Sequence, residues 1–160
     1  MEIREVAVIG AGTMGAGIAQ VCAQAGWKTN LFDAFPEGLE RGMARIDAFW
    51  DKGIARGKTT PEQKAEWGAR LHAVGDLAEA VGNADMVIEA VPEIPDLKQS
   101  IFADLDRLAP AHAILGTNTS SLSIAGIAAA TSRPEQVIGM HFFNPVPIMK
   151  LLELVRHDST

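Results

Sequence analysis

The 160-residue sequence has a single cysteine, Cys22, so an internal disulfide is excluded and a reducing cytosol is the expected compartment. It lacks an apolar run of the roughly 20 residues that a membrane-spanning helix needs, and it starts with no basic, apolar leader. No internal repeat or low-complexity tract is present. These absences predict a soluble cytoplasmic protein built as one compact domain.

Basic residues are also scarce relative to acidic ones. Lysine and arginine number 14 against 20 aspartates and glutamates, which gives a formal net charge of −6. A surface of this sign repels a polyphosphate backbone, so nucleic acid is not expected as the main partner. An anionic small molecule can still bind where positive charge is concentrated locally.

Short apolar segments alternate with segments of helical composition along most of the chain. Strands are predicted at residues 5–9, 28–32, 71–74, 86–90, 113–115 and 136–140, with an edge strand within 150–155. Helices are predicted from the turn at 10–12 to near residue 26 and at 36–56, 61–70, 96–108 and 123–130. The alternation predicts an α/β fold with a doubly wound, mostly parallel sheet and a helical hairpin inserted after the second strand.

Gly10, Gly12 and Gly15 form a G-x-G-x-x-G pattern between the first expected strand and the first expected helix. The first glycine permits a tight turn, the second lets a pyrophosphate approach the backbone, and the third allows close packing of the helix on the strand. Thr13 and Met14 lie within the pattern, where the helix N-terminus offers free N–H groups to phosphates. Glycine-rich turns also serve purely structural roles, so the pattern alone leaves both interpretations open.

Asp33 favours the nucleotide-binding interpretation. It ends the second expected strand 21 residues after Gly12, close to the spacing of about 20 expected for a carboxylate that binds ribose hydroxyls. The same carboxylate would repel a 2′-phosphate, and residues 34–36 supply no arginine to bind one. The sequence therefore predicts NAD rather than NADP as the cofactor.

Four segments together resemble the L-3-hydroxyacyl-CoA dehydrogenases. They are residues 10–20, VIEAVPE at 87–93, TNTSSL at 117–122, and HFFNPVP at 141–147 continuing into LLELV at 151–155. They occur in order over nearly the whole chain, so the combination is far more specific than any one motif. The resemblance implies that residues 1–160 form a Rossmann-type NAD-binding domain acting on an acyl-CoA in fatty acid metabolism. It also implies that the family's C-terminal helical domain, absent from these residues, would mediate homodimer formation in a full-length protein.

The resemblance assigns the chemistry to two residues. His141 matches the base that takes the substrate's 3-hydroxyl proton as hydride leaves carbon 3, and imidazole can accept and return a proton near neutral pH. A structural histidine at a strand end is the alternative. Glu153 matches the glutamate that hydrogen-bonds this histidine, and a carboxylate in an otherwise apolar strand is costly unless paired. A solvent-facing glutamate on an edge strand is the alternative.

Four further residues match positions of the family's site. Ser120 resembles its serine near the substrate hydroxyl and nicotinamide, and Asn144 its asparagine beside the catalytic histidine, although both residue types are common in turns and caps. Glu93 and Lys98 match positions that touch the nicotinamide side of NAD, with ordinary solvated charges as the alternative. No metal site is expected.

Two other functions remain open from sequence. A dehydrogenase of the same superfamily could act on a non-CoA hydroxy acid such as gulonate or carnitine, although the Phe142–Phe143 pair favours the CoA enzymes. A non-catalytic NAD-binding module is disfavoured by the presence of both His141 and Glu153. Basic residues at 52, 56 and 58 on the expected hairpin could bind phosphates of coenzyme A or simply solvate a helix face, so they are not counted as site residues.

Overall fold

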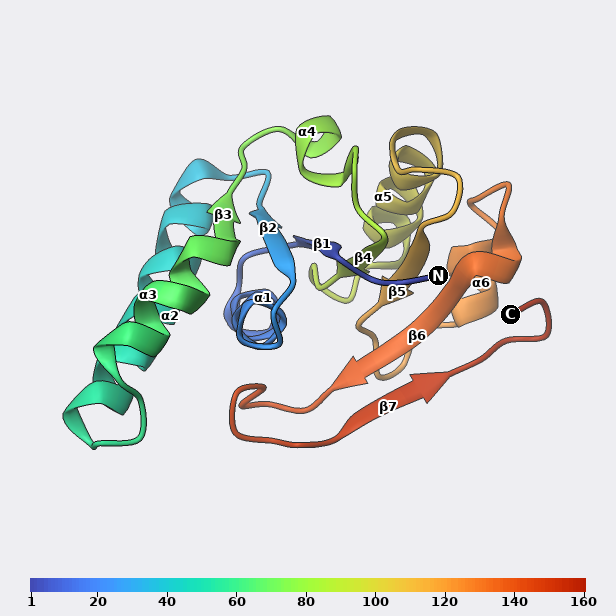
Figure 1. The fold of residues 1–160 in the computed structure, drawn as a ribbon. Helices are drawn as coiled ribbons and strands as arrows, with labels where there is room; N and C mark the ends of the chain where they lie inside the picture. Colours follow the sequence, from blue (N-terminus) through green and yellow to red (C-terminus); the bar gives the residue numbers. More distant parts are fainter.

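In the computed structural model, which describes residues 1–160, seven strands form a single sheet. The strands are β1 (Glu5–Ile9), β2 (Lys28–Phe32), β3 (Leu71–Ala73), β4 (Met86–Glu89), β5 (Ile114–Thr117), β6 (Val137–Phe142) and β7 (Leu152–Val155). Their spatial order is β3-β2-β1-β4-β5-β6-β7; the first six strands are parallel and β7 runs antiparallel to β6 (Figure 1). Chain order reverses between β1 and β4, where sheets of this kind bind ligands beyond the carboxyl ends of the strands.

Helices cover both faces of the sheet. They are α1 (Thr13–Gln24), α2 (Pro36–Ala55), α3 (Pro61–Arg70), α4 (Leu77–Val81), α5 (Pro95–Leu108) and α6 (Ile124–Ala128), with a 3₁₀ turn at Pro134–Gln136. Because side chains of a strand alternate between faces, Val6 and Val8 of β1 pack in the core with α1 and α2. Ala7 and Ile9 pack in the opposite core with α4, α5 and α6. The central strands are therefore buried on both sides.

The hairpin predicted after the second strand is formed by α2 and α3. Gly57, at φ +71°, lies in the turn between them, and Thr60 and Gln63 form a reciprocal capping box at the start of α3. The rings of Trp50 and Trp67 lie 5.8 Å apart and pack the two helices together. Figure 1 shows the hairpin beside β3, at the opposite edge of the sheet from β7.

The predicted strands and helices are all present, with ends shifted by up to about two residues. The short helix α4 was not predicted, because five residues are too few to show a helical period, although Asp76 caps it by accepting a hydrogen bond from the N–H of Glu79. Cys22 and Trp50 are buried, whereas Trp27 and Trp67 are only partly buried. No helix is both long enough and apolar enough to cross a bilayer.

Candidate active site

The glycine turn joins β1 to α1 and leaves space for a ligand at one position. Gly10 has φ +103°, and a Cβ there would lie 2.7 Å from the carbonyl oxygen of Ala90. A Cβ on Gly15 would collide with the carbonyl group of Gly10, which explains why the helix needs glycine to approach the strand. A Cβ on Gly12 would meet nothing within 4 Å, so open space lies over the backbone next to the α1 N-terminus.

A cleft of about 840 Å³ follows the carboxyl ends of β1, β2 and β4. Asp33 lies in this cleft after β2, where its carboxylate accepts hydrogen bonds from the N–H groups of Ala11, at 2.8 Å, and Phe35, at 2.9 Å. A carboxylate has about four acceptor sites, so capacity for ribose hydroxyls remains. The open backbone at Gly12 and this fixed acceptor fit a dinucleotide. The predicted cofactor residues that line the cleft are Gly10, Gly12, Thr13, Met14, Asp33 and Glu93.

A second hollow of about 300 Å³ adjoins the cleft at Asp33, Gly12 and Thr13. Its other lining residues include Arg41 and Arg45, one turn apart on α2. The sequence argument against a phosphate beside Asp33 considered only residues 34–36 and missed these two guanidinium groups. Their spacing of four residues on a predicted helix was the available signal.

The third hollow, of about 270 Å³, holds the predicted catalytic residues. Ser120, His141 and Asn144 line it together, from the segment after β5 and from the end of β6. Its other lining residues are Met14, Glu93, Asn118, Phe142 and Phe143, and the first three of these also line the cleft. The cleft and the catalytic hollow therefore meet at Met14, Glu93 and Asn118.

His141 and Glu153 face each other across β6 and β7, in register. The distance between His141 Nδ1 and Glu153 Oε1 is 3.7 Å, which is within ion-pair range but too long for a hydrogen bond. The Glu153 side chain is 59% exposed, and all four residues of β7 are exposed. The cost expected for an unpaired carboxylate in this apolar strand therefore does not apply, because the strand lies at the edge of the sheet, in contact with solvent, as in the alternative left open by the sequence. The pairing of Glu153 with His141 stays a prediction.

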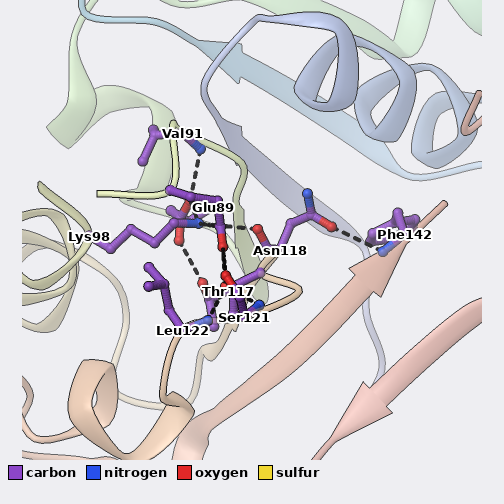
Figure 2. A network of polar contacts seen from close by, with 10 residues as sticks. Glu89, Val91, Lys98, Thr117, Asn118, Ser121, Leu122 and Phe142 are labelled. Carbon is purple, nitrogen blue, oxygen red and sulfur yellow. Dashed lines mark hydrogen bonds and ion pairs between the residues drawn. The ribbon is translucent and has the colours of Figure 1, made fainter. Parts of the chain in front are cut away.

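A buried polar network, shown in Figure 2, is connected to Glu93 and Asn118, which line both the cleft and the catalytic hollow. The side chains of Glu89 and Lys98 are fully buried, and Lys98 Nζ lies 2.8 Å from Glu89 Oε2. Lys98 also contacts Glu93 Oε1 at 3.0 Å and the carbonyl oxygen of Asn118 at 3.1 Å. Lys98 lines none of the hollows described above, but it touches Glu93, which does line the cleft, and its contact with the cofactor stays a prediction.

The two carboxyl groups of the network have opposite shifts in pKa. Burial raises the pKa of Glu89, outweighing the charge of Lys98 and the hydrogen bonds from Lys98, Thr117 and Val91. For Glu93 partial burial acts to raise the pKa, but hydrogen bonds from Thr119 and Lys98 and the charge of Lys98 lower it overall. Glu93 is therefore held as an anion at the edge of the cleft.

Comparisons with known proteins agree with this geometry. Residues 5–160 match the family model described as 3-hydroxyacyl-CoA dehydrogenase, NAD binding domain. A probable 3-hydroxybutyryl-CoA dehydrogenase of Bacillus subtilis is 45% identical over the whole chain, which covers 55% of that protein, and a 3-hydroxyadipyl-CoA dehydrogenase of Escherichia coli is 46% identical, with 34% of it covered. The crystal structure of 3-hydroxybutyryl-CoA dehydrogenase from E. coli superimposes with a TM-score of 0.96 at 45% identity, over the whole chain and 34% of that structure.

The chain belongs to the 3-hydroxyacyl-CoA dehydrogenase family. Its matched part is the family's NAD-binding domain, which confirms the predicted fold class and NAD as the cofactor. The chain spans about half the length of the Bacillus subtilis relative and a third of the E. coli one. The roles of individual residues stay predictions.

Sequence reasoning missed two polar residues of this 3-hydroxyacyl-CoA dehydrogenase domain. Asn118 lines both the cleft and the catalytic hollow, and its Oδ1 accepts a hydrogen bond from the N–H of Phe142 at 3.0 Å. Its position directly after β5 was the available signal, because polar residues at the carboxyl ends of parallel strands face the ligand. Glu89 ends β4 within an apolar run, and a carboxylate there indicates a buried cation nearby.

Proposed function

We propose that this chain is the NAD-binding and proton-transfer part of an enzyme that oxidises L-3-hydroxyacyl-CoA to 3-ketoacyl-CoA. The observation that carries the proposal is the junction of the dinucleotide cleft with the hollow around His141, through Met14, Glu93 and Asn118. A substrate carbon at that junction would lie between the cofactor and the imidazole. Hydride and proton transfer need this arrangement.

The residues of the cleft would hold NAD. The open backbone at Gly12 and the α1 N-terminus would receive the pyrophosphate, and Asp33 would accept hydrogen bonds from the ribose. Glu93 lies where the cleft meets the catalytic hollow, so it would contact the nicotinamide half of NAD. When bound there, NAD accepts the hydride that leaves carbon 3 of the substrate.

In the proposed reaction His141 takes the proton of the 3-hydroxyl group. The substrate thus loses one hydride from carbon 3 and one proton from oxygen, and the C–O single bond becomes a carbonyl. Ser120 and Asn144 line the same hollow and are exposed, so their hydroxyl and amide groups can hydrogen-bond the reacting oxygen. Glu153, across the strand pair, would stabilise the imidazolium that forms.

A fourth hollow, of about 110 Å³, extends the catalytic hollow and could hold part of an acyl-CoA. It shares Asn144 with the catalytic hollow and continues between α1 and α2, where Ile46, Phe49 and Val146 line it. Beyond it the hairpin carries Lys52, Arg56 and Lys58, which are exposed. We propose that the acyl-pantetheine arm follows this hollow and that the phosphates of coenzyme A lie toward the basic hairpin.

Three statements about the whole protein belong to the same proposal. A helical domain that closes the cleft would complete the protein, and the matched region is only part of the length of the relatives. A homodimer would form through that domain. Cytoplasmic location is supported by the single, buried cysteine.

The proposal is tested by following NADH formation from NAD with L-3-hydroxybutyryl-CoA as substrate, in the protein that carries this chain. The D-enantiomer and the non-CoA acids 3-hydroxybutyrate, gulonate and carnitine serve as matched comparisons. We expect turnover with the L-acyl-CoA only. Turnover of a free hydroxy acid with none of the acyl-CoA would refute the proposed substrate class.

The cofactor assignment has its own test in Asp33→Ala. Loss of the charged acceptor should weaken NAD binding by about 1 to 3 kcal/mol, with a smaller loss or a gain for NADP. Glu37→Ala, an exposed acidic residue in the first turn of α2, is the control and should leave both affinities unchanged. Equal affinity of the wild-type protein for NAD and NADP would contradict the role given to Asp33, and would point to Arg41 and Arg45 instead.

A further inference from the structure

Arg45 lies where α2 packs against the start of α1. Gly42, almost one turn earlier on α2, approaches the glycine turn so closely that a Cβ there would lie 2.6 Å from the carbonyl oxygen of Ala11. Ile46, the residue after Arg45, is buried in the core that α1 and α2 share. These contacts fix the backbone of α2, and the side chain of Arg45 is left exposed beside the N-terminus of α1.

Two hollows meet at Arg45. The second hollow, of about 300 Å³, connects it to Gly12, at the turn proposed to receive the pyrophosphate of NAD. The fourth hollow, of about 110 Å³, connects it to Phe49 and Asn144, along the path proposed for the acyl-pantetheine arm. Thr13 also lines both hollows, but Arg45 is the one charged residue common to them. Its guanidinium group therefore lies between the sites proposed for the two ligands.

No carboxylate of the chain neutralises this guanidinium group. Neither Arg45 nor Arg41, one turn earlier on α2, forms an ion pair within the chain. A guanidinium group carries several N–H donors in a planar fork and keeps its charge at any physiological pH. Arg45 can therefore donate hydrogen bonds into both hollows at the same time.

The charges of the two proposed ligands give this position a function. NAD carries a pyrophosphate, and coenzyme A carries a pyrophosphate and a ribose phosphate, so both ligands are anions on a domain whose formal net charge is −6. Two anions that bind next to each other repel, and by itself this repulsion makes each bind more weakly when the other is present. A cation between the two anions attracts both and offsets the repulsion.

We propose that Arg45 contacts both the pyrophosphate of NAD and the acyl-CoA, and thereby couples the binding of the two ligands. The inference rests on the proposed function, because it takes the acyl-CoA as the second ligand. The coupling is reciprocal, so each ligand tightens the binding of the other by the same factor. Arg41 lines the second hollow but not the fourth, so it can support cofactor binding without contributing to the coupling.

The test measures the coupling in the complete protein with NADH and L-3-hydroxybutyryl-CoA. Both are in the reduced form, so they bind together without reacting. The coupling factor is the Kd for NADH alone divided by the Kd for NADH at a saturating concentration of the thioester, with NADH fluorescence as the signal. It is determined for wild type, Arg45→Gln, Arg41→Gln and Arg4→Gln. Arg4, an exposed residue just before β1, controls for the loss of one positive charge.

We expect a wild-type coupling factor of at least about 5, the lower end of typical couplings between sites, and a factor of about 1 or less in Arg45→Gln. The Kd for NADH alone should rise by no more than about 5-fold in Arg45→Gln, the scale of one exposed charge contact. Arg41→Gln should weaken NADH binding to a similar extent but keep the wild-type factor. Arg4→Gln should change neither quantity.

Three results would overturn the inference while the proposed function stands: a wild-type factor of about 1, the wild-type factor retained in Arg45→Gln, or an equal loss of coupling in Arg41→Gln. The last would show that the charge of the second hollow, and not the position of Arg45, sets the coupling. A wild-type protein that neither binds nor oxidises the thioester would refute the proposed function, and the inference with it.

Discussion

Two acid–base pairs lie at the carboxyl edge of the same sheet and differ in their exposure to solvent. Glu89 and Lys98 are both fully buried, 2.8 Å apart, and all their polar atoms have partners. His141 and Glu153 are 24% and 59% exposed and 3.7 Å apart, and they lie beside an edge strand that is exposed throughout. The Glu89–Lys98 pair is therefore closed, meaning that protein encloses it, and the His141–Glu153 pair is open to solvent.

The difference separates what this domain fixes by itself from what depends on its surroundings. Removing one partner of a buried pair typically costs about 3–5 kcal/mol, so the geometry around Lys98 is strongly held. An exposed pair is worth about 1 kcal/mol or less, and the position of Glu153 is correspondingly weakly held. We therefore expect the cofactor side to be preorganised and the proton-transfer side to need the rest of the protein.

The largest expected effect tests this division directly. Residues 1–160 alone should bind NADH at micromolar or weaker affinity but oxidise L-3-hydroxybutyryl-CoA more than about 1,000-fold more slowly than the longer relatives, because the proposed helical domain that would close the cleft and hold carbon 3 of the substrate against the nicotinamide is missing from them. Turnover on a monodisperse sample, compared with the Bacillus subtilis relative, checks this. Near-equal turnover would show that the open pair needs no further support.

The next effect concerns the base. His141→Gln in the complete protein should lower kcat by at least about 100-fold, the usual scale for a lost general base, with little change in the Kd for NADH. His72→Gln, at an exposed position on β3, is the control and should have no effect. Unaltered turnover in His141→Gln would exclude this residue as the base.

Glu153→Gln should have a smaller effect on turnover, and its pH dependence reports how exposed the His141–Glu153 pair is to solvent. The neutral amide stabilises an imidazolium less than the carboxylate does, so the acidic limb of the pH–rate profile should move to lower pH. If the pair stays as exposed in the complete protein as it is here, the shift should be less than about one pH unit. A larger shift would mean that the rest of the protein buries the pair, and an unchanged profile would mean that the two side chains do not interact.

The smallest effect is expected for Glu93→Gln, at the exposed margin of the closed network. Because the pKa of Glu93 is lowered from its ordinary 4.5 in the folded protein, its carboxylate stabilises the fold above that pH, and this contribution is lost as pH falls through the lowered value. At 40% exposure the contribution should be about 1 kcal/mol or less. The difference in urea-unfolding free energy between wild type and Glu93→Gln should therefore shrink between neutral pH and about pH 3.

The pH dependence of the wild-type unfolding free energy would not by itself reveal the contribution of Glu93. Burial raises the pKa of Glu89, so that group favours the folded state increasingly as pH falls through its raised value, which is the opposite sense. Only the difference between wild type and variant isolates Glu93. Glu62→Gln, at an exposed position in the first turn of α3, is the matched control, and an equal pH response in it would contradict the prediction.

The fold and the cofactor cleft were largely predictable because their signals are local. The strand, glycine turn and helix of residues 5–24 and the carboxylate of Asp33 lie within one short segment, and each follows from backbone geometry. The catalytic hollow was predictable only through resemblance, since Ser120 and His141 come from separate strand ends that the sheet brings together.

What could not be predicted depends on burial. No pattern in the sequence distinguishes Lys98, which is fully buried, from Lys64, which pairs with two aspartates on the surface. Similarly, LLELV is as apolar as many core strands, yet all four residues of β7 are exposed at the edge of the sheet. The positions of Arg41 and Arg45 beside Asp33 required the placement of α2, which the sequence did not provide.

The single cysteine provides a built-in reporter for these experiments. Cys22 lies in α1 within the apolar core, and burial raises the pKa of its thiol to about 12, so the reactive thiolate is scarce in the folded protein. A thiol-labelling reagent should therefore modify this position only when the domain opens. The labelling rate would then follow opening in wild type and in each variant without an engineered probe, and would separate a variant that opens more often from one that is folded but misaligned.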